Sequence, residues 1–138
     1  NACMEMAKDW YRVHEDPEHD YRLEKVAMCR AFHAFDALGM EGLALYADGR
    51  IVAMTMGNRL RTDTYDVNFE KAYADIPGAY PLINREFARL IRERYPEIRY
   101  LNREEDMGLP GLRKSKLSYH PDVLLEKFRG FQNPEVTL

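Results

Sequence analysis

The stretch that decides the fold runs from Asp66 to Tyr119 and reads DVNFEKAYADIPGAYPLINREFARLIRERYPEIRYLNREEDMGLPGLRKSKLSY. It predicts a strand (64–71), a turn (75–78) and an amphipathic helix (79–95). These are followed by a short apolar strand (98–101), a charged run (102–106) and a short basic helix (110–119). Residues 98–101 are short and apolar, as expected of a central strand that the chain reaches by a helical crossover.

The first of these strands alternates strictly between apolar and polar side chains. Its apolar members are expected on one face and its polar members on the other: Tyr65, Val67 and Phe69 against Asp66, Asn68 and Glu70. Such alternation predicts that one face is buried and that the other is wet or lines a cleft.

The rest of the chain supplies further helices and strands. Periodic apolar residues predict two helices (4–14 and 21–38) and two strands (43–47 and 51–56) ahead of the stretch above. A last strand is predicted after it, over 123–128. Asp48-Gly49 predicts a type I′ hairpin turn, which needs positive φ at both central residues. We therefore expect an α+β fold, in which an antiparallel meander followed by helix, strand, helix and strand forms a mixed sheet with helices on both faces.

Composition bounds the class of protein. The 138 residues are enough for a single domain with a sizeable core, and the net charge of −3 argues against a general nucleic-acid binder. No apolar run has the length of a membrane span. Cys3 and Cys29 lack the spacing of metal ligands, so we expect free thiols in a reducing cytoplasm. The chain begins Asn1-Ala2 without an initiator methionine, and we expect these two residues to be a tag remnant on a domain of a longer protein.

Glu70 is a candidate catalytic residue near the end of the alternating strand, beside Lys71. A carboxylate in a cleft can accept a proton from an attacking amine, directly or through water. The alternative is a cross-strand ion pair on a solvated face, since ion pairs perturb charges as often as sites do.

The run from Asn102 to Asp106 follows the second strand, at the carboxyl end where open α/β sheets put their sites. Its three consecutive acidic residues require a partner, which would be an amine, a metal ion or the basic helix that follows. No EF-hand spacing is present. Arg103 and Glu104 are therefore candidate catalytic residues, with a structural charge network as the alternative.

Three basic residues, Arg113, Lys114 and Lys116, are expected on the short helix. They would hold a phosphate-rich donor, either a tRNA end or a nucleotide. A solvated charged face is the alternative explanation of such a run.

The element order resembles that of the acyl-CoA N-acyltransferase superfamily, the GNAT fold, although the usual first strand is not visible. Four segments are more specific: GLALYADGRIVAMTMGNRL, VNFEKAYADIPGAYPLINREF, YLNREEDMGLPGLRKSKLSYHP and LLEKF. They resemble the C-terminal half of a bacterial family of unknown function that is related to the catalytic domain of phosphatidylglycerol lysyltransferases. The resemblance covers residues 4–129.

The resemblance implies that the complete protein carries two such folds in tandem and that this chain is the second. Lysyltransferase relatives move an aminoacyl group from a charged tRNA to a lipid head group, and the wider superfamily moves acyl groups from coenzyme A to amines. In acetyltransferases a phenol at the place of Tyr119 often serves as general acid for the leaving thiolate; packing at a helix end is its alternative role. Asn68 stands where the family is expected to have a histidine, and an amide cannot act as a general base.

One departure from the superfamily pattern concerns the pyrophosphate loop. Coenzyme A users cradle that group with a glycine-rich loop close to Arg/Gln-x-x-Gly-x-Gly/Ala at a helix N-terminus. The corresponding residues here are Gly78, Ala79 and Tyr80. Pro77 before them lacks an N–H, and Asp75 adds negative charge. The helix N-terminus remains a candidate phosphate site.

Two functions stay open. The first is an acyl or aminoacyl transferase with an acyl-CoA or aminoacyl-tRNA donor and an amine or hydroxyl acceptor. Backbone N–H groups of the sheet would polarise the carbonyl. The chemistry would be carried by Glu70, Arg103, Glu104 and Tyr119. The second is a non-catalytic half that packs on the N-terminal half and forms one wall of a shared ligand cleft.

Overall fold

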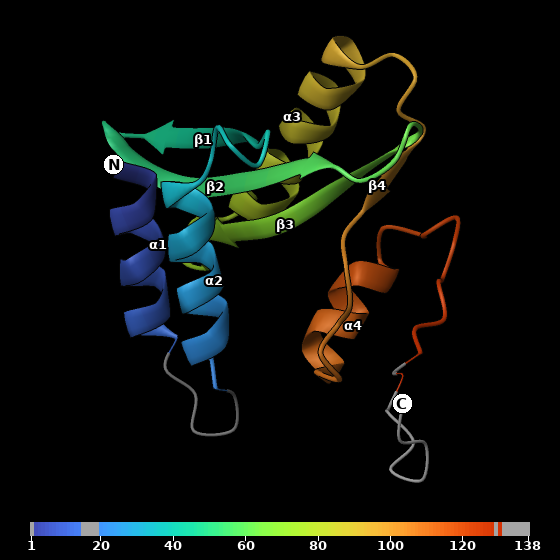
Figure 1. Cartoon of the computed structure of the whole chain (residues 1–138). Helices are drawn as coiled ribbons and strands as arrows, with labels where there is room; N and C mark the ends of the chain where they lie inside the picture. The colour runs from blue at the N-terminus through green and yellow to red at the C-terminus, as the bar shows by residue number, and fades with distance from the viewer. Residues whose placement is uncertain (1, 15–19, 129, 131–138) are drawn as a thin grey trace, which may run out of the picture. The chain divides into compact units, whose positions relative to one another are not determined.

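The computed structural model describes residues 2–14, 20–128 and 130, in two compact units that comprise residues 1–104 and 105–138 (Figure 1). Its described residues in the first unit form three helices and four strands: α1 (Ala2–Val13), α2 (Arg22–His33), β1 (Glu41–Ala47), β2 (Arg50–Arg59), β3 (Thr64–Ala72), α3 (Ala79–Arg94) and β4 (Tyr100–Asn102). The second unit contains α4 (Pro110–Leu117). No helix in these described ranges has the length and apolar content that a bilayer crossing demands.

The sheet has the order β1-β2-β3-β4. The first three strands form an antiparallel meander, and β4 pairs with β3 in parallel, with Asp66 opposite Asn102. The helical crossover from β3 to β4 is therefore confirmed, but β4 lies at an edge of the sheet and not at its centre as expected, because no further strand in the described residues pairs with it. The hairpin turn is confirmed too, since Asp48 has φ 49° and Gly49 has φ 76°.

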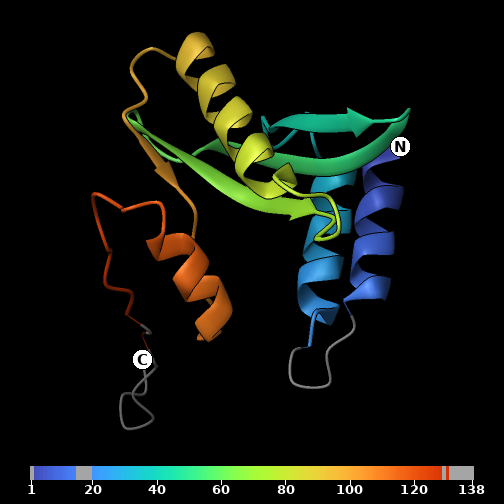
Figure 2. The ribbon, with the colours of Figure 1, turned by 180° about the vertical axis from the view of Figure 1, so that it is seen from behind.

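Helices cover both faces of this sheet, as the sequence predicts. Figure 1 shows α1 and α2 against one face, and Figure 2 shows α3 crossing the other. On the α1/α2 face, Trp10, Met28, Met54 and Met56 belong to one buried apolar cluster. On the α3 face, two smaller clusters are centred on Ala53 with Ile83 and on Tyr65 with Phe87.

A β-bulge interrupts the alternation of side chains along β3. Beyond the bulge, the side chains lie on the face of the sheet opposite to the one expected from the sequence. Met56 of β2 opposes Phe69 while the next residue, Gly57, opposes Val67, so Asn68 is the extra residue. Tyr65 and Val67 pack on the α3 face, whereas Phe69 packs on the α1/α2 face. The bulge therefore moves Glu70 from the face expected for it to the α3 face.

Gly57 is the residue that makes room for this bulge. A Cβ added there would lie 2.0 Å from the backbone oxygen of Asp66, far inside van der Waals contact. Only glycine lets the two backbones approach so closely.

Two further expectations are wrong at the level of elements. The second helix ends at His33 rather than at residue 38, and a series of turns follows up to Gly39, which has φ 58°. Residues 123–128, expected to be a strand, form none. Their large apolar side chains are exposed, and a strand requires a neighbouring edge to pair its N–H and C=O groups.

Candidate functional site

Glu70 and Arg103, two of the residues predicted from the sequence, lie together on the α3 face of the sheet. An Arg103 guanidinium nitrogen is 3.0 Å from Glu70 Oε1. Only 10% of the Glu70 side chain and 25% of the Arg103 side chain are exposed. The pair is therefore largely withdrawn from solvent, unlike the solvated-face ion pair considered as an alternative from the sequence.

Asn84 of α3 completes the surroundings of Glu70, because its Nδ2 donates to Glu70 Oε2 at 3.2 Å. Each carboxylate oxygen thus accepts one hydrogen bond from protein, and each retains capacity for another. A carboxylate held in this way is oriented and charge-balanced, and it can still accept a proton from a bound nucleophile.

The backbone beside Glu70 is open on one side. The ladder between β3 and β4 ends at Asp66 and Asn102. No strand in the described part of the chain pairs with the rest of β3 on that side. Backbone N–H groups of β3 beyond the bulge are therefore available to polarise a carbonyl next to Glu70.

Glu104 follows directly after this pair. Its backbone N–H donates to Asn102 Oδ1 at 3.0 Å, its φ is 56°, and it is exposed. Asn68 lies at the bulge, where its Nδ2 donates to Asp66 Oδ2 at 3.2 Å. These two hydrogen bonds connect residues next to the bulge and next to the end of β4.

The acidic run continues into the second unit, where it binds the basic helix. Arg113 contacts Asp106 at 2.5 Å, and Lys116 Nζ donates to the backbone oxygen of Glu105 at 2.7 Å. The hydrogen bond from Arg113, and then that from the Gly108 N–H, hold the pKa of Asp106 below its usual range. A charge network, the alternative given from the sequence, is therefore confirmed for Asp106 and Arg113.

The other predicted residues of the second unit are exposed. Lys114 lies on α4, and Tyr119 follows it, donating its backbone N–H to the Lys116 oxygen at 3.2 Å. The predicted residues thus divide between the units: Glu70, Gly78, Ala79, Tyr80, Arg103 and Glu104 in the first, and Arg113, Lys114, Lys116 and Tyr119 in the second.

The N-terminus of α3 offers few donors to a phosphate. Gly78 precedes the helix with φ 80°, and Ala79 already donates its N–H to the Ile76 oxygen at 3.2 Å. Pro81, in the first turn, has no N–H at all, which leaves Tyr80 as the remaining first-turn donor. Burial raises the pKa of the Tyr80 phenol. Pro77 was recognised from the sequence as a weakness of the cradle, whereas Pro81, whose position in the helix weakens the cradle further, was not.

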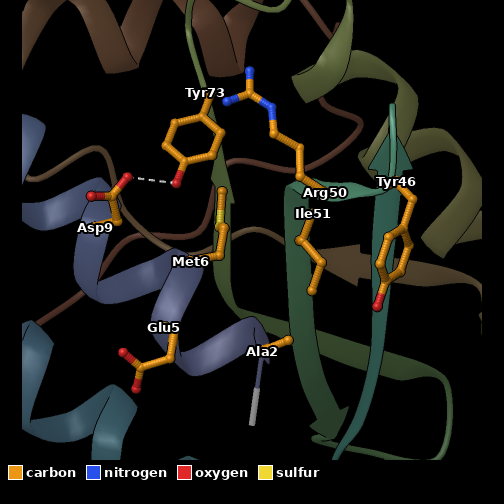
Figure 3. Close-up of a pocket in the computed structure, with 9 residues that line it drawn as sticks. Ala2, Glu5, Met6, Asp9, Tyr46, Arg50, Ile51 and Tyr73 are labelled. Carbon is orange, nitrogen blue, oxygen red and sulfur yellow. Dashed lines mark hydrogen bonds between the residues drawn. The ribbon is translucent and has the colours of Figure 1, made fainter.

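A separate hollow of about 400 Å³ lies between α1 and the β1–β2 hairpin (Figure 3). Tyr73 points into it and donates its hydroxyl to Asp9 Oδ2 at 2.7 Å, while the Arg50 guanidinium lies 5.9 Å from the Tyr73 ring centre. Burial, and next the hydrogen bond to Asp9, raise the pKa of Tyr73 to about 12. None of the residues predicted to be functional lines this hollow.

Two residues that shape the site were missed by the sequence argument. Asn84 is a polar residue between Ile83 and Phe87 of the helix's apolar face, and that interruption was a usable signal. Gly57 in the middle of a strand was a second signal, because an interior glycine often marks a bulge.

Comparison with known proteins places this geometry in a family. A model of the phosphatidylglycerol lysyltransferase C-terminal region matches residues 1–130. A conserved protein of unknown function from Bacteroides thetaiotaomicron VPI-5482 is 43% identical, with a TM-score of 0.81 over 88% of this chain. The chain spans 40% of the length of that relative. No curated protein matches the chain.

More distant solved structures share the fold. A ribosomal-protein-alanine N-acetyltransferase from Brucella melitensis biovar Abortus 2308 is 12% identical, with a TM-score of 0.59, over 96% of this chain and 90% of its own. An acetyltransferase-like protein from Clostridium difficile 630 is 9% identical, with a TM-score of 0.63, over 95% and 89%. The expected GNAT fold is thereby confirmed. The chain belongs to the phosphatidylglycerol lysyltransferase C-terminal family.

Proposed function

We propose that this chain is an acyl or aminoacyl transferase domain in which Glu70 accepts the proton of the attacking nucleophile. The observation that carries the proposal is the Glu70–Arg103 pair, held on the α3 face by the bulge at the point where β3 and β4 part. A largely buried acid beside open sheet backbone is the arrangement that direct acyl transfer requires.

The mechanism is a direct attack on the donor carbonyl. An acceptor amine or hydroxyl forms the new bond to the carbonyl carbon, its proton passes to a Glu70 oxygen, and the bond to the donor's leaving oxygen or sulfur breaks. Arg103 and Asn84 orient the carboxylate. Backbone N–H groups of β3 stabilise the oxyanion. The leaving oxygen or sulfur takes up a proton from water.

The donor is proposed to be an aminoacyl-tRNA rather than an acyl-CoA. The first turn of α3 has one remaining N–H donor, and a pyrophosphate cradle needs several. The family description names a lysyltransferase that acts on phosphatidylglycerol, which supports a lipid head-group hydroxyl as acceptor.

A second candidate function is a non-catalytic half that packs on an N-terminal half of the same parent protein. This chain spans 40% of its 43% identical relative, so a partner region within one polypeptide is a reasonable requirement for a complete cleft. The two protein hydrogen bonds to the Glu70 carboxylate also suit a purely structural role.

Donor binding separates these functions. Thermal unfolding of the chain is measured alone, with acetyl-CoA, with adenosine 3′,5′-bisphosphate as control, and with a charged and an uncharged tRNA. A donor at about a hundred times its dissociation constant stabilises the folded state by about 2.7 kcal/mol. We expect a shift with tRNA and none with acetyl-CoA. No shift with any donor, in this chain and in the full-length protein, would favour the non-catalytic half.

A further inference from the structure

Lys71, the neighbour of Glu70, is buried on the opposite face of the sheet. Its side chain is 9% exposed, and its Nζ lies 2.6 Å from Glu24 Oε1 of α2. The same ammonium lies 4.1 Å from the Trp10 ring centre, 5.0 Å from that of Tyr11 and 6.0 Å from that of Tyr21. Three aromatic rings and one carboxylate thus form a cage around the cation, which we call the Lys71 cage.

Removing a charged ammonium from water costs free energy, which suggests a specific role for this site. A buried ammonium is tolerated only with a well-placed counter-charge, and a buried ion pair often adds little net stability compared with apolar packing. Its better-attested use is to select one structure among several similar ones. The competing structure must therefore be one in which Lys71 could not occupy the cage.

The obvious competitor is β3 without its bulge. Before the bulge Gly57 opposes Val67, and an unbroken ladder would continue this register along β2. Every residue from 69 onward would then move to the place of its successor and change face, because side chains alternate along a strand. Loss of the bulge would therefore move Glu70 and Lys71 to the opposite faces of the sheet, and each would lose its present contacts.

The present pairing shows where Glu70 would lie in that regular register. Glu70 would oppose Met54, which is where Lys71 is now, and would enter the cage beside Glu24. Two carboxylates would then meet among aromatic rings.

The contacts on the α3 face would also become unfavourable in the regular register. Lys71 would oppose Ala53, in the place of Ala72, within the apolar cluster around Ile83. Phe69 would occupy the place of Glu70 and leave Arg103 without its carboxylate.

We propose that the Glu70–Arg103 and Lys71–Glu24 pairs, of opposite polarity on opposite faces, lock the bulged register of β3, and that Lys71 is a positioning residue for Glu70. Trp10 assists this lock, because its indole N–H donates to the backbone oxygen of Ala72 at 2.9 Å. The relevance of Glu70 to chemistry rests on the proposed function; the register lock itself does not.

A double substitution tests the lock by making the regular register more favourable than the bulged one. Glu70→Lys/Lys71→Ala puts a lysine at the cage and an alanine opposite Ala53 only if β3 adopts the regular register. In the bulged register it places a lysine beside Arg103 and leaves the cage empty. We expect the variant to adopt the regular register. In cross-strand NOE spectra of the 138-residue chain, the Met56 contact to Phe69 should be replaced by one to Asn68. Retention of the Met56–Phe69 contact as the only one overturns the proposal.

Single substitutions keep the test decisive if that variant fails to fold. Lys71→Met preserves the length and apolar stem but removes the charge, and it should give two sets of cross-strand contacts. Lys71→Arg should restore one set. Lys25→Met, which removes the charge of an exposed lysine of α2 and leaves both pairs of the lock intact, is the matched control and should keep the bulged set alone. A single bulged register in Lys71→Met contradicts the lock, whatever the transfer activity of the protein.

Discussion

At the residue scale, the hydrogen bond between Tyr73 and Asp9 joins the end of the meander to α1. That bond, and next the one from Arg12, hold the pKa of Asp9 below its usual range. A carboxyl whose pKa is depressed in the folded state stabilises it above the unfolded pKa, about 3.9, and loses that contribution as pH falls through the folded pKa.

Replacement of Tyr73 by phenylalanine should therefore raise the pKa of Asp9 toward its usual value. The contribution of Asp9 to stability above pH of about 4 should shrink, so the loss of stability on acidification becomes shallower. The measurement is a carboxyl-carbon NMR titration, combined with urea unfolding between neutral and acid pH. Tyr46→Phe is the control, because Tyr46 lines the same hollow and is 67% exposed. An unchanged Asp9 titration in Tyr73→Phe would show that the bond is not formed in solution.

At the scale of elements, the bulge in β3 governs the site. The sequence predicted β3, the helix that follows it and the short strand after that helix, because each has an apolar pattern, but it did not place that short strand at the edge beside β3. It did not predict the facing of Glu70, since a bulge has no periodicity of its own and its mark was a single glycine in the neighbouring strand. The error at residues 123–128 has a related cause: apolar residues suited to a strand form one only where an edge accepts their backbone.

Gly57→Ala tests the bulge directly. Because the new Cβ would lie 2.0 Å from the Asp66 backbone oxygen, either the chain is destabilised or the strands separate locally. We expect a loss of at least about 2 kcal/mol in the free energy of unfolding, a value typical of overpacked cores, and weakening of the Met56–Phe69 contact. Gly111→Ala is the control, since its Cβ meets nothing within 4 Å and alanine favours a helix. Equal unfolding free energies for the two variants would refute the close approach.

At the scale of the whole molecule, the family and the fold were accessible from the sequence through the four resembling segments, and both are confirmed. The site was accessible only in part. Glu70 and Arg103 were identified by their position at strand ends, yet their mutual contact depends on the bulge and on Asn84. Arg113 pairs with Asp106 and Lys116 donates to the backbone oxygen of Glu105 within their own unit, which their spacing alone could not reveal.

The central claim is that the Glu70 carboxylate takes the proton during acyl or aminoacyl transfer. Its most direct test is single-turnover transfer of a radiolabelled aminoacyl group from charged tRNA to phosphatidylglycerol vesicles by the full-length protein, compared among wild type, Glu70→Gln and Glu93→Gln. Glu93 is an exposed residue of α3 and serves as the control. We expect Glu70→Gln to lower the rate constant by about 10²–10⁴-fold, the usual contribution of a general base, with Glu93→Gln unchanged. Transfer by wild type with an equal rate in Glu70→Gln would contradict the claim.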